Sequence, residues 1–237
     1  MVEQQLTTLS WTEFAWCAFL YKMINAGDEA YQKLTKGKVD VKELIKFLNK
    51  WKTRVVNSKD SAKALARKIE ISRDDLSSLR QFNIRNVDLV TVGGPSSPVL
   101  HAIENCYGAI REPPEYNIGP TATAKILHIL HPDLFVMWDN PILSYFKKQY
   151  PGKVKDSGRG YCEYLRLMQQ VAAHVTQGFE REEIHPGKTL DTYLSDRLEY
   201  NPAKTMAKYL DEYYWVTQTH FKKIELPPKW YPEKKAV

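Results

Sequence analysis

The chain has 237 residues, of which 43% are hydrophobic and 12% aromatic. This composition supplies enough apolar surface for a sizeable core and excludes disorder over most of the length. Lys and Arg number 34 against 28 Asp and Glu, and the resulting formal charge of +6 suits either a polyanionic partner or a merely solvated basic surface.

The first predicted helix runs from about Trp11 to Asn25. Ser10 and Glu13 form a capping box directly before its apolar residues, and Gly27 is typical of a helix end. No basic stretch leads into an apolar run over Met1–Thr8, and the most apolar early segment is far too short to span a bilayer. We therefore expect a protein that is neither secreted nor inserted into a membrane.

A basic helical region follows. Apolar residues at steps of three and four predict a helix with a core-facing stripe from Val41 to Val55. Between Lys33 and Lys68 the chain has 12 Lys or Arg and three acidic residues. This excess of positive charge makes the segment the first candidate for a phosphate-facing surface, with a solvated helix face as the alternative.

The remaining apolar patterns also favour helices over strands. They cover Ser61–Ile69, Asp74–Phe82, a segment from Ser97 to Pro113, Ile142–Tyr150, Tyr161–Gln177 and Asn201–Phe221. Asn201 and Pro202 have the residue types of a helix cap and a first helical position. Val87–Val92 is the one weak strand-like segment, so the predicted fold class is all-α.

Gly93-Gly94-Pro95 is a strong break between these helices. It separates an N-terminal helical region with a basic stripe, residues 1–95, from a second helical region, residues 96–237. The two regions correspond either to two helical lobes or to parts of one large helical domain.

Three cysteines, Cys17, Cys106 and Cys162, lie far apart in the chain, with no CxxC pair and no histidine at metal-ligand spacing. Each has apolar or aromatic neighbours, which is typical of a small buried thiol. We expect neither a zinc site nor a disulfide framework, and a reducing, cytoplasmic setting.

The centre of the chain contains a tight turn, Asn117-Ile118-Gly119-Pro120, that leads into a helix. Asn and Gly tolerate positive φ, and Pro120 suits a first helical turn. Turn amides followed by a helix N-terminus can seat a phosphate, although a turn between two helices is commonplace. The apolar connector Leu134–Trp138 then delivers Asp139.

The stretch Ile118-Gly119-Pro120-Thr121-Ala122-Thr123-Ala124-Lys125-Ile126-Leu127, followed by Phe135-Val136-Met137-Trp138-Asp139, resembles the signature of the helix-hairpin-helix DNA glycosylase superfamily. In that family a glycine-rich turn leads into a helix, an apolar connector and an aspartate. The similarity covers about residues 116–141 and implies a helix-hairpin-helix element within the all-α fold.

The resemblance implies that Asp139 lies beside the sugar of a nucleotide flipped out of the duplex and is catalytic. Its carboxylate would offset the positive charge that develops on the sugar and assist an attacking water. The alternative role is helix capping, because Asp139-Asn140-Pro141 is a good helix start.

The position of the family's Schiff-base lysine is occupied by Thr121, and Lys125 lies one turn further along the same helix face. Thr121 and Lys125 are therefore secondary candidates, and any activity is expected to be monofunctional. Three cysteines cannot form the iron–sulfur cluster of some relatives, whereas a structural monovalent cation at the hairpin is compatible with the resemblance.

Further candidates surround this element. The DNA-backbone candidates are Asn117, Ile118, Gly119, Thr121, Lys147, Lys148 and Arg159, with solvation as the alternative for the charged ones. Gly158 and Gly160 are expected to keep the loop around Arg159 flexible. Trp138, Tyr145 and Tyr161 are candidates for stacking on a flipped base, with core packing as the alternative. His128 and His131 are expected at the surface or a helix end.

Two functions follow as hypotheses. The first is a monofunctional DNA glycosylase, a base-excision repair hydrolase that binds duplex DNA with damaged bases and needs no metal for its chemistry. The second is a non-catalytic nucleic-acid-binding protein built on the same hairpin.

Overall fold

The computed structural model describes residues 9–24, 31, 34–35, 39–87, 89, 97–113, 115–183 and 186–220. Among them there are helices, turns and loops but no strand, so the predicted all-α fold is confirmed. Gly27, the break at 93–95 and most of 87–92 lie outside the described residues. In chain order the elements are α2 (Trp11–Ile24), α4 (Val41–Lys50), α5 (Lys59–Ile71), α6 (Arg73–Leu79), α7 (Pro98–Arg111), α8 (Pro120–Leu130), α9 (Asn140–Gln149), α10 (Gly158–Arg181), α11 (Leu190–Arg197), α12 (Met206–Trp215) and a π-helical turn, η1 (Val216–His220).

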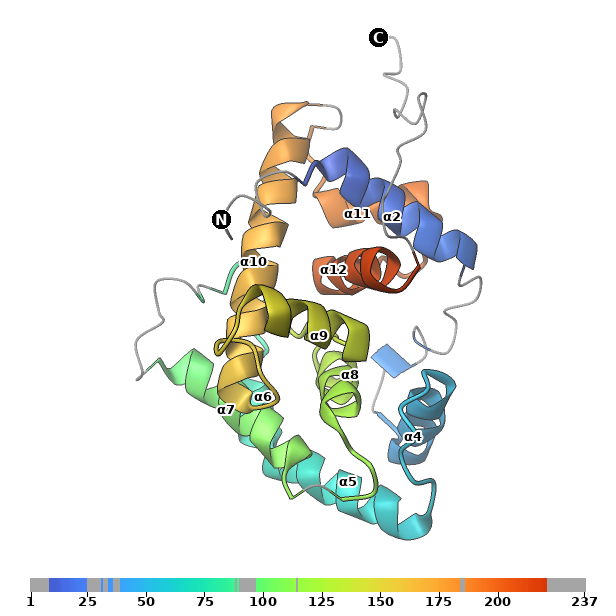
Figure 1. Ribbon diagram of the computed structural model, residues 1–237. Coiled ribbons are helices and arrows are strands. Elements are labelled where there is room, and N and C mark those ends of the chain that lie inside the picture. Colours follow the sequence, from blue (N-terminus) through green and yellow to red (C-terminus); the bar gives the residue numbers. More distant parts are fainter. Residues whose placement is uncertain are drawn as a thin grey trace.

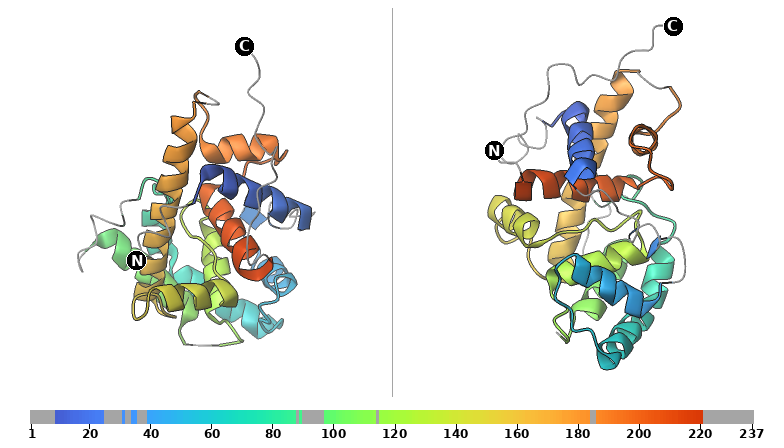
Figure 2. Two further views of the ribbon diagram at one scale, coloured as in Figure 1. Left: turned by 45° about the horizontal axis from the view of Figure 1, so that its top comes forward. Right: turned by 90° about the vertical axis from the view of Figure 1, so that its right-hand side faces the viewer.

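The long helix α10 runs along one side of the molecule and joins its two ends (Figure 1). Near one end it packs on α7, which also contacts α5, α6 and α8. Near the other it packs on α2 and α12. Figure 2 shows α2 lying against the C-terminal helices from two further directions. The N-terminal helix therefore belongs spatially to the end of the molecule that the C-terminal helices build.

One continuous core connects these helices. A single cluster of buried side chains includes Phe14 of α2, Leu44 of α4, Trp138 of the connector and Leu210 of α12. Regions 1–95 and 96–237 thus share one hydrophobic core.

The predicted start of the first helix at Trp11 is confirmed, whereas the predicted end of α4 and the predicted start of the final helix are wrong. Helix α4 ends at Lys50, before the predicted limit at Val55, because Lys52 and Arg54 both adopt φ of 59°. The final helix begins at Met206, capped by the Thr205 hydroxyl, and not at Asn201. Helix α11 was not anticipated from the sequence.

The predicted loop containing Gly158 and Gly160 is also wrong, because both residues lie in the first turn of α10. Gly160 is buried against Lys155, where an added Cβ would lie 2.2 Å from the backbone oxygen. Glycine therefore permits a close backbone approach here and does not provide flexibility.

The cysteines are confirmed as buried free thiols. Burial raises the pKa of Cys106 to about 12. His128 lies in the last turn of α8 and His131 is its C-cap, so both lie at a helix end, as one of the two predicted locations has it. The surface alternative is wrong: both residues are buried, and each ring bonds a backbone carbonyl, that of Phe135 at 2.5 Å and that of Leu79 at 2.9 Å. None of the described helices is both long and apolar enough to cross a membrane.

Candidate functional site

A cleft of about 580 Å³ opens where α2, α8, α9, α12 and the loop after α4 converge. Its walls carry both ionisable and aromatic side chains. The lining residues are Tyr21, Lys50, Trp51, Lys52, Thr53, Arg54, Asn117, Gly119, Pro120, Thr121, Ala122, Lys125, Asp139, Asn140, Pro141, Asp211 and Trp215. The hairpin, Lys125 and Asp139, which the sequence singles out, are thus brought together at one concave site.

The segment between α7 and α8 contains the turn Asn117-Ile118-Gly119-Pro120, called the hairpin here. Hydrogen bonds from α5 and from the loop after α4 hold this segment in place. The backbone N–H of Val56 donates to the Tyr116 carbonyl at 2.9 Å, and the Asn117 amide donates to the Arg54 carbonyl at 3.3 Å. Buried Lys68 of α5 donates to the carbonyls of Glu112 and Pro113 at 2.8 and 3.0 Å. These bonds fix the hairpin against the loop that forms the opposite rim of the cleft.

Only some of the amides predicted to seat a phosphate are left without a backbone acceptor. The N–H groups of Ile118 and Gly119 already donate to carbonyls within the turn, at 2.9 Å each, and the Ile118 side chain is buried. Pro120 has no N–H, so the first-turn amides of Thr121 and Ala122 are the ones that point out of α8 without a backbone acceptor among the described residues. They lie at the positive end of the helix dipole.

A monovalent cation at the hairpin stays a prediction. The carbonyls of Glu115, Asn117 and Gly119 each already accept a hydrogen bond within the turn or from α8.

Asp139 is the half-buried acid of the cleft. Its Oδ1 accepts the Ile142 N–H at 3.0 Å, so it caps α9, as the alternative role for this residue predicts. Burial raises the pKa of Asp139, and the nearby carboxylate of Asp211 raises it further, whereas the cap bond and Lys125 act in the opposite direction. Capping uses one oxygen only, so the two roles proposed for Asp139 are compatible.

Lys125 is the partly buried amine of the same site. Its Nζ donates to the Trp51 carbonyl at 3.1 Å and lies 5.1 Å from the centre of the Trp51 ring. Burial lowers the pKa of Lys125, and the nearby acids Asp211 and Asp139 limit that decrease. Thr121 instead donates its hydroxyl to Asn140 at 3.2 Å, near the cleft mouth.

Comparisons with protein-family models, curated proteins and solved structures give no match.

The aromatic residues predicted to stack on a base lie elsewhere. Trp138 and Tyr161 are fully buried, and they donate to the carbonyls of Pro120 and Val136 at 3.1 and 2.8 Å. Both rings therefore belong to the core, and their hydrogen bonds fix the backbone of the hairpin and of the connector. Tyr145 packs on Phe146 and Tyr214 and lines a separate small cavity.

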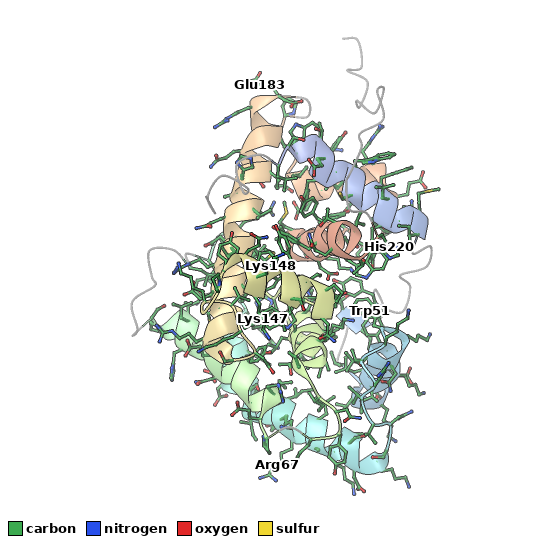
Figure 3. The ribbon with its side chains drawn as sticks, viewed as in Figure 1. Trp51, Arg67, Lys147, Lys148, Glu183 and His220 are labelled. Carbon is green, nitrogen blue, oxygen red and sulfur yellow. The ribbon has the colours of Figure 1, made fainter. Side chains whose placement is uncertain are left out.

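The basic residues that follow Asp139 are exposed but do not line the cleft. Lys147 and Lys148 project from α9, as Figure 3 shows, and Arg159 lies at the start of α10. The cations at the cleft rim are instead Lys50, Lys52 and Arg54, all exposed. They come from the basic segment that the sequence identified as a candidate phosphate-facing surface.

Sequence reasoning missed the far wall of the cleft. Tyr21, Asp211 and Trp215 belong to helices at opposite ends of the chain, and Trp51 follows α4. Trp51 lies at the cleft wall close to α4 (Figure 3). The one local signal was the spacing of Asp211 and Trp215, which places them on one face of a helix, but nothing in the sequence relates that face to Asp139.

Proposed function

We propose that this protein is a monofunctional DNA glycosylase that hydrolyses the N-glycosidic bond of a nucleotide flipped into the cleft. The supporting observation is the convergence in one cleft of Asp139, the first-turn amides of α8 and the cationic rim Lys50, Lys52 and Arg54. A cleft of about 580 Å³ is within the usual size range of sites that bind small molecules, and therefore has room for a single base.

Each part has a distinct task in this proposal. The rim cations and the amides of Thr121 and Ala122 bind phosphates on either side of the flipped nucleotide, which fixes its position without reading sequence. The Asp139 carboxylate offsets the charge that develops on the sugar as the base leaves, and orients the attacking water. Such electrostatic stabilisation is most effective in a partly desolvated site.

Water is the nucleophile because Thr121 occupies the position of the family's lysine. Lys125 contributes positive charge that partly counteracts the rise in the pKa of Asp139, and its Nζ is directed to the Trp51 carbonyl. A lysine of lowered pKa in a cleft is also suited to amine chemistry, so trapping with borohydride is a necessary control. A protein–DNA adduct that forms when borohydride is added, and that is lost in Lys125→Met, would overturn the monofunctional assignment.

The experiment compares wild type with Asp139→Asn on duplexes that each carry one damaged or mismatched base, followed by alkali to cleave abasic sites. Asn caps a helix about as well as Asp, so this variant keeps α9 intact. We expect a loss of activity of about a hundredfold or more. Asp133→Asn is the matched control, because Asp133 is exposed and does not line the cleft. Equal activity of wild type and Asp139→Asn would refute the catalytic role.

The second candidate is a nucleic-acid-binding protein without catalysis. The observation that favours it is the bond from the Ile142 N–H to Asp139, which gives this residue a structural task that accounts for it without catalysis. That function predicts no abasic product from any duplex, together with binding that weakens steeply as salt increases. Substituting Lys52 by Met would then reduce both the affinity and the salt dependence.

A further inference from the structure

The loop after α4, residues 51–56, is strained and forms part of the cleft rim; we call it the rim loop. Lys52 and Arg54 both adopt φ of 59°, in the left-handed region, although neither is glycine. A side chain makes this conformation unfavourable, so it persists only where surrounding contacts hold it. Something other than local preference therefore fixes the rim loop.

Side-chain donors from three parts of the chain hold the backbone carbonyls of the rim loop. Lys125 of α8 donates to the Trp51 carbonyl at 3.1 Å, the Asn117 amide of the hairpin to the Arg54 carbonyl at 3.3 Å, and the Asn49 amide of α4 to the Val55 carbonyl at 2.8 Å. Lys125 and Asn117 belong to α8 and the hairpin, which form the opposite rim. Their bonds therefore join the two rims of the cleft.

Lys125 makes the more sheltered of these two bonds. Its side chain is partly buried, whereas Asn117 is exposed. The ammonium lies 5.1 Å from the centre of the Trp51 ring, which packs on Phe47 with ring centres 4.2 Å apart. Trp51 is also the C-cap of α4, so the ammonium lies at the negative end of that helix dipole. Lys125 thus interacts with both the backbone and the ring of the residue at which the rim loop begins.

The cationic side chains of the rim loop remain available to a ligand. Lys52 and Arg54 are exposed and line the cleft, and neither forms a salt bridge with an acidic residue among those that the structure describes. A loop whose backbone is fixed in advance does not have to be ordered when a ligand binds. The strained backbone and its side-chain donors therefore present two cations at the cleft mouth before any ligand arrives.

We propose that Lys125 and Asn117 are positioning residues that hold the rim loop so that Lys52 and Arg54 bind phosphates of the DNA backbone. In this role Lys125 does not contact the DNA and affects binding only through the rim loop. A Lys125 that binds a phosphate directly is the competing explanation. The inference rests on the proposed function, because it requires the rim cations to bind phosphates.

The test is a double-mutant cycle on the affinity for an end-labelled, undamaged duplex, measured by fluorescence anisotropy at several salt concentrations. Lys52→Met removes one charged contact, so we expect about tenfold weaker binding and a salt slope smaller by about one. Lys125→Met should weaken binding at least as much, because it releases the rim loop. In the Lys125→Met background, Lys52→Met should then change the affinity by less than about twofold. Direct contact by Lys125 predicts instead that the two effects multiply, to about a hundredfold loss.

Two further variants serve as controls. Lys147 is exposed and lies on α9 outside the cleft, so Lys52→Met should keep its effect of about tenfold in a Lys147→Met background. Lys125→Arg retains a donor for the Trp51 carbonyl and should likewise preserve the effect of Lys52→Met.

Circular dichroism checks that each variant folds. If Lys125→Met does not fold, Asn117→Gly and Arg54→Met give the equivalent cycle, because glycine accepts the Asn117 φ of 60° and only the side-chain bond is lost. An undiminished effect of the rim cation in either cycle would overturn the inference. No effect of Lys52→Met in wild type would refute the phosphate-binding rim as well. Coupling without abasic product in the Asp139 assay would refute only the glycosylase proposal.

Discussion

Lys208→Met is expected to be one of the most destabilising single substitutions in the chain. Lys208 is fully buried and its ammonium pairs with Asp211 at 2.9 Å and with Glu212 at 3.5 Å. Methionine fills a similar volume but leaves Asp211 without its cation, whereas Glu212 keeps Lys204 at 2.6 Å. Removing one partner of a buried ion pair costs about 3–5 kcal/mol, because the other charge is left uncompensated.

For a chain of this size about 1 kcal/mol corresponds to about 2–4 °C in Tm, so the expected decrease is about 6–20 °C. Urea denaturation and thermal unfolding followed by circular dichroism would measure it. Lys188→Met breaks an exposed lysine–aspartate pair and should change stability by less than about 1 kcal/mol. Adding Asp211→Asn to Lys208→Met should recover part of the loss. A loss for Lys208→Met no larger than that for Lys188→Met would refute the buried-pair argument.

Three further outcomes are expected. Gly160→Ala should unfold at a lower urea concentration than wild type, because the added Cβ would lie 2.2 Å from the Lys155 carbonyl oxygen. Gly108→Ala is the control: its added Cβ would have no atom within 4 Å, and it should stabilise α7 by up to about 1 kcal/mol. Equal urea midpoints for the two variants would contradict this expectation. The lowered pKa of Lys125 means that the unfolded chain binds more protons between that pKa and the ordinary value of about 10.4. The stability of wild type should therefore rise with pH relative to Lys125→Met as the pH approaches 10, and a flat difference would disprove the shift. If Asp139 acts in its ionised form, kcat/KM should fall at acidic pH as Asp139 becomes protonated. Because the pKa of Asp139 is raised, this fall should occur above the ordinary aspartate value of about 3.9. A pH profile of kcat/KM that falls only below that value would argue against Asp139.

The sequence predicts the part of the site that is contiguous. The turn at Asn117, the helix from Pro120 and the delivery of Asp139 depend on local rules, namely turn chemistry, capping and helical period, and the structure places them at one cleft. Lys125 is found by the same reasoning, since the helical repeat places it on the face of Thr121.

Burial and distant pairing are not local properties. An isolated aromatic residue such as Trp138 has the same neighbours in sequence whether its ring stacks on a ligand or on the core. Asp211 lies 72 positions from Asp139 by residue number, and only the packing of α12 against α2 and α9 brings both to the cleft. The left-handed residues Lys52 and Arg54, neither of them glycine, likewise give no sequence signal for the end of α4.

The pairing of α2 with α12 also sets the order in which the site can be assembled during synthesis. Asp139 leaves the ribosome about 70 residues before Asp211 and Trp215, and the hairpin leaves earlier still. At usual translation rates of about 5–20 residues per second this is a delay of several seconds. Until then Tyr21 has no α12 to pack on, and the nascent chain holds a half-built cleft whose acid is exposed to water. The cleft is therefore completed only as α12 is translated.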